Sequence, residues 1–515
     1  MRILILMAGK GQRFIDAGYK IPKPFIRVAG RLIIEHIVKN FSNDDFFVFG
    51  CNEEQLSKFN AFEILNSIVP QHSIVSMPYK KEGPIYGLKM MNEYIPDNEP
   101  VIVNYCDFSW GWDYDDFKKI VKESNCDGAV VCYRGFHPHL LGQNSYATLD
   151  SDGIWMKEIK EKHSWHNTKF EDWSSSGTYY FKKGSYLKKY IYELDKKPEL
   201  KINNEHYVSQ LYQLMKEDGF KILIYEIPYM LQWGTPEDLA HYLYWSNYFN
   251  ETNQSINDIT MEMDIIIPMA GEGMRFKQAG YLTPKPLISI NGLPMVVNAT
   301  KCLPRGHRYI FITRTEHLSN YNIDKILSNH INNVEVITSD TLTEGQACSV
   351  LLAKSKIRVD FPLFIGACDN GMTFDLEKFK SLISNPNIEA LIFTFRGNPT
   401  VEINPSMYSW VLCDNSGRVL SVKMKQPISK NPINDHAVVG AFWFKKGKYF
   451  IENSEEMIKE NSRVNGEFYI DNTINYLVKN DYKVYVFEID KYICWGTVND
   501  LKIYEYWEKY FRLKN

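Results

Sequence analysis

The sequence predicts an α/β protein made of two tandem domains, each with a doubly wound and mostly parallel sheet. The first observation is a repeat: residues 4–25, LILMAGKGQRFIDAGYKIPKPF, return 262 positions later as residues 266–287, IIPMAGEGMRFKQAGYLTPKPL. The second is that each copy begins with an apolar run ending at a glycine-rich loop, as expected for a buried parallel strand. The third is the alternation of later apolar runs with helical segments, which is typical of a doubly wound sheet.

The repeat continues through nearly the whole chain at a constant spacing. The matched pairs include Glu82 and Glu344, Asp107 and Asp369, Asp113 and Asp375, Tyr146 and Tyr408, Glu205 and Glu467, Trp233 and Trp495, and Trp245 and Trp507. We therefore predict one domain over residues 1–249 and a second over residues 264–515. The stretch between them, residues 250–263, is polar and lacks periodicity, which indicates a linker.

The elements of each copy follow in a definite order. A buried strand opens the copy, an apolar stretch follows the Pro-Lys-Pro turn, and a further strand ends just before an aspartate. The expected strands and apolar stretches are Arg2–Met7, Phe25–Val28 and Val101–Cys106 in the first copy, and Asp264–Met269, Leu287–Ile290 and Pro362–Cys368 in the second. Arg31–Phe41, Asp115–Ser124 and Glu377–Ile383 are expected to be helices. Because ligands bind beyond the carboxyl ends of such strands, we expect the glycine loop and the aspartate to share one site in each copy.

Composition excludes several classes of protein. The chain has 515 residues, 44% of them hydrophobic, which is enough for two substantial cores. A net charge of −3 gives no electrostatic case for binding nucleic acid or a membrane surface. No apolar run is long enough to span a membrane, and the nine cysteines contain no C-x-x-C pair. We expect a cytoplasmic protein with reduced thiols, among which Cys106 and Cys368 are predicted to be buried.

The repeated loop has the residues needed to bind phosphate. After each strand, Ala-Gly-x-Gly-x-Arg lets backbone N–H groups approach phosphate oxygens, and the arginine can clamp them bidentately. The loop residues are Ala8, Gly9, Gly11 and Arg13 in the first copy and Ala270, Gly271, Gly273 and Arg275 in the second. Lys23 and Lys285, each flanked by prolines, add a second cation on a stiff support. The pairing of these two elements, found twice, predicts a phosphate site in each copy.

These motifs resemble those of nucleotidyltransferases of the sugar-phosphate and phosphocholine type, with a glycine-rich loop, an arginine and then Pro-Lys-Pro-Leu. The pattern AGxGxRFxxAGYxxPKPLI is most similar to the branch found in capsule and surface-polysaccharide pathways. The resemblance covers nearly all of both halves and implies a Rossmann-like fold of the GT-A type. It implies that an NTP and a phosphorylated sugar or small alcohol react, with release of pyrophosphate, to give an NDP-activated product. It tilts the nucleotide slightly toward CTP.

The resemblance also implies a role for individual residues. Arg13 and Arg275 would hold the departing pyrophosphate, Lys23 and Lys285 would neutralise charge at the α-phosphorus, and Asp107 and Asp369 would bind Mg²⁺. The nucleobase would lie against Glu82 and Gly83 in the first copy and against Glu344 and Gly345 in the second. Lys162, Glu205 and Glu467 would bind the acceptor. For Glu205 and Glu467, a structural role as a carboxylate at the start of a helix is an equal alternative. Asp113 and Asp375 would either support the metal or cap the following helix, and the cap explains them at least as well.

Three positions depart from the pattern. Relatives carry a lysine after the central strand that contacts the acceptor phosphate; Glu161-Lys162 matches this pattern, whereas Gln426 stands in place of the lysine in the second copy. A second metal-binding aspartate, common two residues before the final Gly-Thr, is replaced by Gln232 and Cys494. His137 and His139 stand around a proline in a predicted loop, where we expect solvated side chains and no metal.

Two other functions remain open at this point. An NDP-sugar-dependent glycosyltransferase would share the architecture and a metal-binding aspartate, but it ordinarily shows an Asp-x-Asp motif that Asp107-Phe108-Ser109 lacks. A nucleotide-binding protein with one or both copies inactive is the other alternative. Only a nucleotidyltransferase would release pyrophosphate, so that product separates the three hypotheses.

Overall fold

The structure, a computed structural model, describes residues 1–80, 82–142, 146–250 and 259–514. Residue contacts divide the chain into two compact units, Met1–Ser246 with Tyr510–Asn515, and Asn247–Lys509. Most of the predicted linker, residues 251–258, lies outside the described residues. The strand that opens the second unit begins at Met261, inside the stretch predicted as linker.

The first unit is built around a nine-stranded sheet with the order β5-β4-β1-β6-β11-β8-β12-β10-β9. Strands β5, β4, β1 and β6 run parallel, and β11 pairs antiparallel with both β6 and β8. The strands of this unit are β1 (Arg2–Leu6), β2 (Arg27–Val28), β3 (Arg31–Leu32), β4 (Phe46–Asn52), β5 (His72–Met77), β6 (Val101–Tyr105), β7 (Phe108–Gly111), β8 (Gly128–Tyr133), β9 (Ala147–Asp152), β10 (Trp155–Glu161), β11 (Trp173–Phe181), β12 (Ile222–Glu226) and β13 (Tyr229–Gln232).

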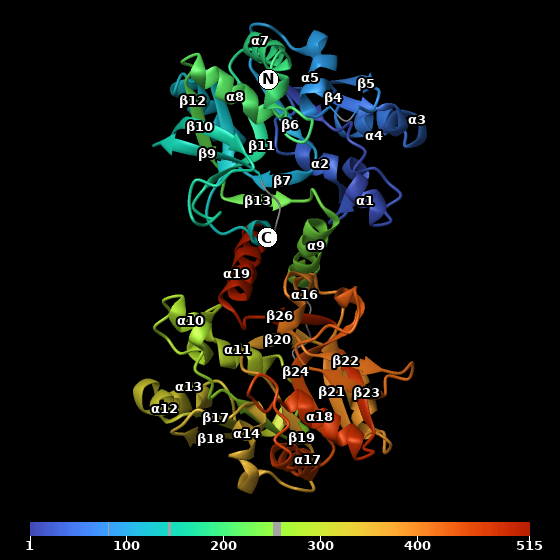
Figure 1. The fold of residues 1–515 in the computed structure, drawn as a ribbon, viewed down its shortest axis with the longest axis vertical. Coiled ribbons are helices and arrows are strands. Elements are labelled where there is room, and N and C mark those ends of the chain that lie inside the picture. The colour runs from blue at the N-terminus through green and yellow to red at the C-terminus, as the bar shows by residue number, and fades with distance from the viewer. Residues whose placement is uncertain (81, 143–145, 251–258, 515) are drawn as a thin grey trace. The chain divides into compact units, whose positions relative to one another are not determined.

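Helices cover this sheet on both faces. In Figure 1, α3 and α4 lie beside β4 and β5, while α7 and α8 lie together near β11 and β10. The helices are α1 (Gln12–Asp16), α2 (Ile33–Val38), α3 (Glu53–Lys58), α4 (Ala61–Ile68), α5 (Pro84–Met90), α6 (Tyr114–Glu123), α7 (Gly184–Asp195), α8 (Val208–Glu217) and α9 (Pro236–Asn250), with 3-10 turns η1 (Lys23–Phe25), η2 (Asn92–Tyr94), η3 (Pro138–Leu141) and η4 (Pro198–Leu200).

The second unit repeats the plan with the order β18-β17-β14-β19-β24-β21-β25, to which β22 and β23 add at β24. Its strands are β14 (Met261–Pro268), β15 (Ser289–Ile290), β16 (Leu293–Pro294), β17 (Gly306–Arg314), β18 (Val334–Ser339), β19 (Leu363–Ile365), β20 (Asn370–Thr373), β21 (Ala390–Phe395), β22 (Trp410–Cys413), β23 (Val419–Lys423), β24 (His436–Phe444), β25 (Val484–Glu488) and β26 (Lys491–Cys494).

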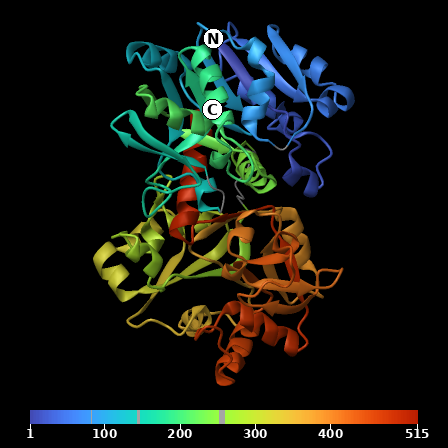
Figure 2. The ribbon, with the colours of Figure 1, turned by 45° about the horizontal axis from the view of Figure 1, so that its top comes forward.

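The helices of the second unit take matching places. Figure 2 shows α17 and α18 in orange-red beside the strands that they cover. They are α10 (Met274–Gln278), α11 (Met295–Lys301), α12 (Thr315–Tyr321), α13 (Ile323–Ser328), α14 (Gln346–Leu351), α15 (Leu376–Ser384), α16 (Thr400–Ile403), α17 (Gly447–Lys459), α18 (Ile470–Lys479) and α19 (Val498–Lys514), with 3-10 turns η5 (Lys285–Leu287), η6 (Lys354–Lys356), η7 (Pro405–Met407) and η8 (Pro432–Asn434).

The opening strand of the second unit shows why the sheet is covered twice. Ile265 and Ile267 belong to one hydrophobic core, and Ile266 belongs to another. Because successive side chains of a strand point to opposite faces, both faces of β14 are buried under helices. The predicted α/β class with two doubly wound units is confirmed, and β1 and β14, which lead into the glycine loops, each lie between two parallel neighbours.

Several predicted boundaries shift by a few residues. The helix expected over Arg31–Phe41 begins at Ile33, because Arg31 and Leu32 pair with Val28 and Arg27 in a short hairpin. The stretch Phe25–Val28 is divided between η1 and β2 for the same reason. Asp113 and Asp375 are helix caps: their carboxylates accept hydrogen bonds from the backbone N–H groups of Asp116 and Lys378. None of the helices in the described parts of the chain is both long enough and apolar enough to cross a membrane.

Candidate functional site

The glycine loop of each copy joins the opening strand to a short helix. Gly11 and Gly273 precede α1 and α10 with φ angles of 65° and 63°, a left-handed conformation that side chains with a Cβ adopt only at a cost. A Cβ on Gly273 would also lie 3.1 Å from the Cβ of Lys285. Glycine at this position therefore lets the loop turn while the lysine packs against it.

A cavity of about 360 Å³ opens above the loop of the first copy. Its lining includes Ala8, Gly9, Gly11, Lys23, Gly83 and Asp107. Glu205 and Tyr207 line it from the segment before α8, and the Tyr207 hydroxyl donates to a Glu205 carboxylate oxygen at 3.4 Å. The structure thus brings the loop, the lysine, the aspartate and one predicted acceptor residue around one volume.

A lysine and an aspartate predicted from separate motifs form an ion pair in both copies. Lys23 Nζ lies 3.1 Å from Asp107 Oδ2, and Lys285 Nζ lies 2.5 Å from Asp369 Oδ2. The pair forms because β1 and β6 are parallel neighbours, so their carboxyl ends meet at one edge of the sheet. The lysine side chains are only 17% and 19% exposed. Burial alone would lower the pKa of each lysine, but the negative charge of the neighbouring aspartate outweighs this effect. The pKa of each lysine is therefore raised overall, and both lysines stay charged.

The arginines of the loop lie at the edge of the same sites. Arg13 is exposed in α1, and its positive charge acts to lower the pKa values of Lys23, Tyr146 and Asp238. Arg275 acts in the same way on Lys425 and Tyr469 in the second copy. Their positions leave the guanidinium groups close to the site with exposed surface available for a ligand.

The glutamates predicted near the nucleobase pair with basic side chains, and Glu82 is not among the residues that line the first-copy cavity. Glu82 is exposed and lies 3.7 Å from Lys80, and Glu344 pairs with Arg463 at 3.0 Å. The neighbouring glycines are tightly packed instead: a Cβ on Gly345 would lie 2.5 Å from the backbone nitrogen and oxygen of Phe468. The backbone at these glycines, rather than the glutamate carboxylates, shapes the wall of the site.

The Trp-Gly-Thr turn closes the site from below in both copies. The backbone N–H of Trp233 donates to the backbone carbonyl of Asp107 at 3.0 Å, and the backbone N–H of Trp495 donates to that of Asp369 at the same distance. A Cβ on Gly234 would lie 3.4 Å from Asp107 Oδ2, and one on Gly496 would lie 3.3 Å from Asp369 Oδ2. Both tryptophans are buried. The turn therefore holds the aspartate in place, which agrees with a role in shaping the pocket.

The oxygen donors of the first copy fit a hard divalent cation. Asp107 supplies a carboxylate, and the Gln232 amide lies near it with its nitrogen as the closer atom, while its buried oxygen has no hydrogen-bond partner. Oxygen ligands of this kind suit Mg²⁺. The second copy offers Asp369 but places the Cys494 thiol where Gln232 stands. Within the described residues, no three His, Cys, Asp or Glu side chains form a group able to hold a metal, so phosphate oxygens and water would have to complete either site.

Sequence comparison of the two copies missed a lysine. Lys162 follows β10 with a φ of 54°, and Lys425, not Gln426, follows β23 with a φ of 59°. Lys425 lies over the ring of Tyr469 at 5.7 Å, and its ammonium donates to the Met407 carbonyl at 2.5 Å. At the constant spacing of 262, Met424 would stand opposite Lys162; one extra residue before the turn places Lys425 there, whereas Gln426 would require two. The second copy therefore retains a lysine at this turn, close to Arg275 and Glu467.

A buried carboxylate stands beside each of these lysines. In the first copy, the Ser209 hydroxyl donates to Glu161, whose pKa is raised by burial and lowered in part by Lys162. In the second, the Ser409 hydroxyl donates to Asp471 at 2.6 Å, and burial likewise raises the pKa of Asp471. This pairing could not be predicted from matched positions, since the acid lies on a strand in one copy and on a helix in the other.

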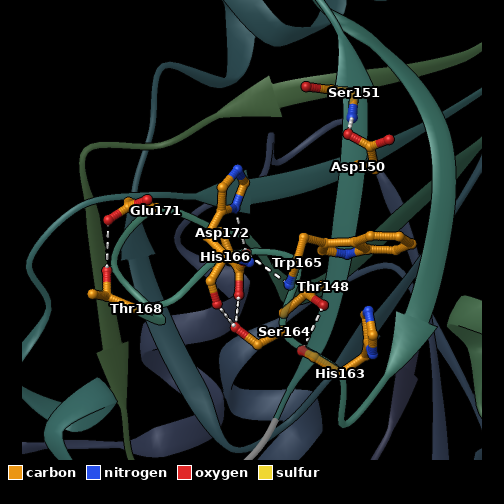
Figure 3. Close-up of polar contacts among 10 residues, drawn as sticks. All are labelled: Thr148, Asp150, Ser151, His163, Ser164, Trp165, His166, Thr168, Glu171 and Asp172. Carbon is orange, nitrogen blue, oxygen red and sulfur yellow. Dashed lines mark hydrogen bonds and ion pairs between the residues drawn. The ribbon is translucent and has the colours of Figure 1, made fainter.

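A loop after Lys162 is fixed by one buried aspartate (Figure 3). Asp172, which is 1% exposed, accepts hydrogen bonds from the Ser164 hydroxyl at 2.5 Å and from the Trp165 and His166 N–H groups at 3.1 Å each. The His166 ring lies 2.7 Å from the same carboxylate. The Thr148 hydroxyl donates to the His163 carbonyl at 2.8 Å, which ties the loop to β9. The segment that follows Lys162 is therefore held in place by specific hydrogen bonds.

The prediction that His137 and His139 are solvated is wrong. His137 is 2% exposed, and burial lowers its pKa to about 4. His139 shares a hydrogen bond of 2.9 Å with the Tyr133 hydroxyl, and burial lowers its pKa well below the usual value. The segment folds inward because these rings pack against Tyr133. Local sequence could not show this, since Tyr133 belongs to β8.

The cysteines are free thiols. Cys106 is buried, as predicted, whereas Cys368 is only partly buried. Burial raises the pKa of both thiols to about 12, so neither is an activated nucleophile at neutral pH.

A buried strand, a glycine loop and a lysine–aspartate pair lie beside one cavity of an α/β unit. Residues 3–152 match the family model described as the MobA-like NTP transferase domain. Over these residues the first copy is therefore similar to the domains of that nucleotidyltransferase family.

A curated relative supports the same class. The chain is 24% identical over 228 residues to the bifunctional protein GlmU of Clostridioides difficile (strain 630). The match covers 43% of this chain and 45% of that protein, so the chain spans less than half the length of this relative.

Solved structures resemble the chain over about half its length. The nucleoside-diphosphate-sugar pyrophosphorylase from Vibrio cholerae RC9 is 18% identical with a TM-score of 0.38, covering 47% of this chain and 99% of its own. The inositol-1-phosphate CTP transferase from T. maritima is 17% identical with a TM-score of 0.39, covering 49% and 97%.

Proposed function

We propose that the chain transfers a nucleotidyl group from an NTP to a sugar 1-phosphate or a phosphorylated small alcohol and releases pyrophosphate. The single observation that supports this most is the lysine–aspartate pair beside the glycine loop, present in both copies. The product would be an NDP-activated precursor, made in the cytoplasm for surface polysaccharide. CTP is the slightly favoured nucleotide.

The chemistry is an in-line displacement at the α-phosphorus. A phosphate oxygen of the acceptor forms the new P–O bond, the bond to the bridging oxygen of the β-phosphate breaks, and pyrophosphate leaves with the electron pair. No covalent intermediate on the protein is needed. Positioning and charge neutralisation supply the catalysis.

The residues of each copy divide these tasks. The backbone at Gly9 and Gly11 would hold the triphosphate, and Arg13 would hold the departing pyrophosphate. Lys23, nearly buried and charged, would face the charge that develops at the α-phosphorus. Gly271, Gly273, Arg275 and Lys285 would do the same in the second copy.

Metal and acceptor occupy the remaining parts of the site. Asp107 with Gln232, and Asp369 in the second copy, would hold the divalent cation. A bound Mg²⁺ supplies neutralisation of phosphate charge and orientation of the triphosphate. Glu205 with Lys162, and Glu467 with Lys425, would bind the acceptor.

We propose that both copies are active. The negative charge of Glu272 in the second loop is partly offset by Arg314, which lies 3.7 Å away and also pairs with Glu316 at 2.9 Å. Lys425 supplies the lysine whose absence would have argued against an acceptor site. These two observations favour catalysis over a binding role for the second copy.

The decisive experiment measures pyrophosphate release with Mg²⁺, testing each common NTP against a panel of sugar 1-phosphates and phosphorylated alcohols. Release that depends on the acceptor supports the proposal and identifies both substrates. Protein that binds an NTP yet stays silent across the panel would favour the binding-protein alternative. Consumption of an NDP-sugar without pyrophosphate would favour a glycosyltransferase.

A further inference from the structure

The first unit carries a second hollow, which shares no lining residue with the cavity above the glycine loop. Its volume is about 410 Å³, and it is lined by Arg134, Gly135, His166, Phe170 and Glu171. The first two residues follow β8, and the other three belong to the loop before β11. The backbone N–H of Gly135 donates to the Phe170 carbonyl at 2.9 Å, so a hydrogen bond joins the two segments that form the hollow.

Arg134 presents its guanidinium to this hollow with no acid beside it. The guanidinium carbon lies 4.4 Å from the centroid of the Trp173 ring. Among the residues that the structure describes, no carboxylate lies within 4.0 Å of the nitrogens of Arg134. A cation–π contact uses the flat face of the guanidinium and leaves the N–H groups at its edge for another partner. The arginine is therefore oriented by the protein and still able to bind an anion.

The matching arginine of the second copy is already occupied. Arg396 Nε and Nη2 donate to the two carboxylate oxygens of Glu488 at 2.8 Å and 2.7 Å. The strand registers place His436 where the first copy has Trp173, so the large ring that holds Arg134 has no counterpart there. The same bidentate geometry that an acid of the protein satisfies in the second copy is thus left open in the first.

The loop that supplies the other wall is held by Asp172, and Figure 3 shows that this loop carries both His166 and Glu171. His166 Nδ1 lies 2.7 Å from the Asp172 carboxylate. Because a carboxylate can only accept, Nδ1 carries the hydrogen, and the other ring nitrogen is left for a ligand. The Thr168 hydroxyl donates to one Glu171 oxygen at 3.2 Å, and that carboxylate keeps further capacity to accept.

We propose that this hollow binds an anionic sugar, a carbohydrate residue that carries a carboxylate or a phosphate group. The planar fork of Arg134 fits either oxyanion bidentately. Phe170 gives an apolar surface for the C–H groups of a sugar ring, and Glu171 and His166 give acceptors for its hydroxyl groups. Glu171 also puts a negative charge on the same hollow, which disfavours a small inorganic anion and favours an anion attached to a hydroxylated body.

Titration calorimetry of the full chain tests this proposal, with glucuronic acid and glucose 6-phosphate as probes. Glucose and inorganic phosphate are the controls, because each carries only half of the recognised chemistry. We expect one site per chain for an anionic sugar and an affinity at least about tenfold weaker for each control. The better of the two probes identifies the oxyanion that the arginine prefers.

Variants assign the binding to the hollow. Arg134→Gln should weaken the affinity for the sugar at least about tenfold, and Arg134→Lys should weaken it as well, because lysine keeps the charge but lacks the fork. The matched change Arg396→Gln should leave binding unchanged, since that arginine is already paired. Lys23→Ala should also leave it unchanged, because Lys23 lines the other cavity. The measurement needs no turnover, so its failure is distinguishable from failure of the proposed reaction.

Three outcomes would overturn the inference: no binding of either probe up to about 10 mM, binding that survives Arg134→Gln, or inorganic phosphate that binds as tightly as the sugars. Should Arg134→Gln fail to fold, Glu171→Gln decides the matter, because Glu171 is exposed. Removing its charge should strengthen the binding of inorganic phosphate relative to that of the sugars. An unchanged preference would contradict the proposed arrangement.

Discussion

Replacing the lysine of each ion pair should separate catalysis from folding and assign activity to the copies. Lys23→Ala and Lys285→Ala each remove a charge proposed to act on the reacting phosphate. At the 3.1 Å separation seen for Lys23 and Asp107, two unit charges interact by roughly 5 kcal/mol at an effective dielectric constant of about 20. Solvent and counterions reduce this value, and loss of one preorganised donor typically costs about 3–4 kcal/mol, or roughly 100- to 1,000-fold in kcat.

The effect on stability should be much smaller. Asp107 and Asp369 are 33% and 28% exposed, so each carboxylate can regain water when its lysine is removed. We expect a loss of about 1 kcal/mol in the free energy of unfolding. Lys20→Ala is the matched control, because Lys20 is an exposed lysine of the same loop and the second copy has Leu282 there.

Pyrophosphate release under saturating substrates is the assay, with denaturant unfolding measured in parallel. If both copies work on different acceptors, each single variant should lose one activity and keep the other. Full activity in the Lys23→Ala, Lys285→Ala double variant would refute the mechanism.

Three further predictions concern stability. Burial lowers the pKa values of His137 and His241 to about 4, so their contribution to the free energy of unfolding is present above pH 6.5 and is lost as the pH falls toward 4, at most about 3 kcal/mol each. The second unit has Pro399 and Ile503 at these positions, so pulse proteolysis should show the first unit opening in acid before the second. Equal acid sensitivity of the two units would contradict this. Gly345→Ala should cost more than about 2 kcal/mol in urea unfolding, because its φ is 128° and its Cβ would strike the Phe468 backbone; Gly292→Ala, with open space and a φ of 79°, should cost only about 1 kcal/mol, and equal costs would count against the steric argument. Asp264→Asn should lower the free energy of unfolding by about 3 kcal/mol, because this 2% exposed carboxylate pairs with both Arg308 and Arg358. The control Glu455→Gln, which breaks an exposed pair with Lys354, should lower it by less than about 1 kcal/mol. A similarly small loss for Asp264→Asn would show that the two arginines are hydrated without it.

The parts of the site that the sequence predicted are those that depend on contiguous residues or on strand order. The glycine loop is one unbroken motif, and parallel strands bring Lys23 and Asp107 together whatever their side chains contact elsewhere. The burial of His137 was not predictable in this way, since it depends on Tyr133 from another strand. The ion pair of Glu82 with Lys80, a residue that lines the cavity, was equally hidden, because a motif does not fix the ion-pair partner of its side chains.

The reversed acid–hydroxyl pairs show a more general reason for such failures. In the first copy, Glu161 lies on a strand and Ser209 lies on a helix. In the second copy, Ser409 lies next to a strand and Asp471 lies on a helix, so the acid and the hydroxyl have exchanged elements. A buried carboxylate needs a hydrogen-bond donor, but that requirement does not fix which element carries which partner. Position-by-position comparison therefore finds no identity where the physical interaction is kept. The carboxylate beside the proposed acceptor lysine comes from the sheet in the first copy and from a helix in the second. We therefore expect the two copies to differ more in the acceptor that they take than in the nucleotide.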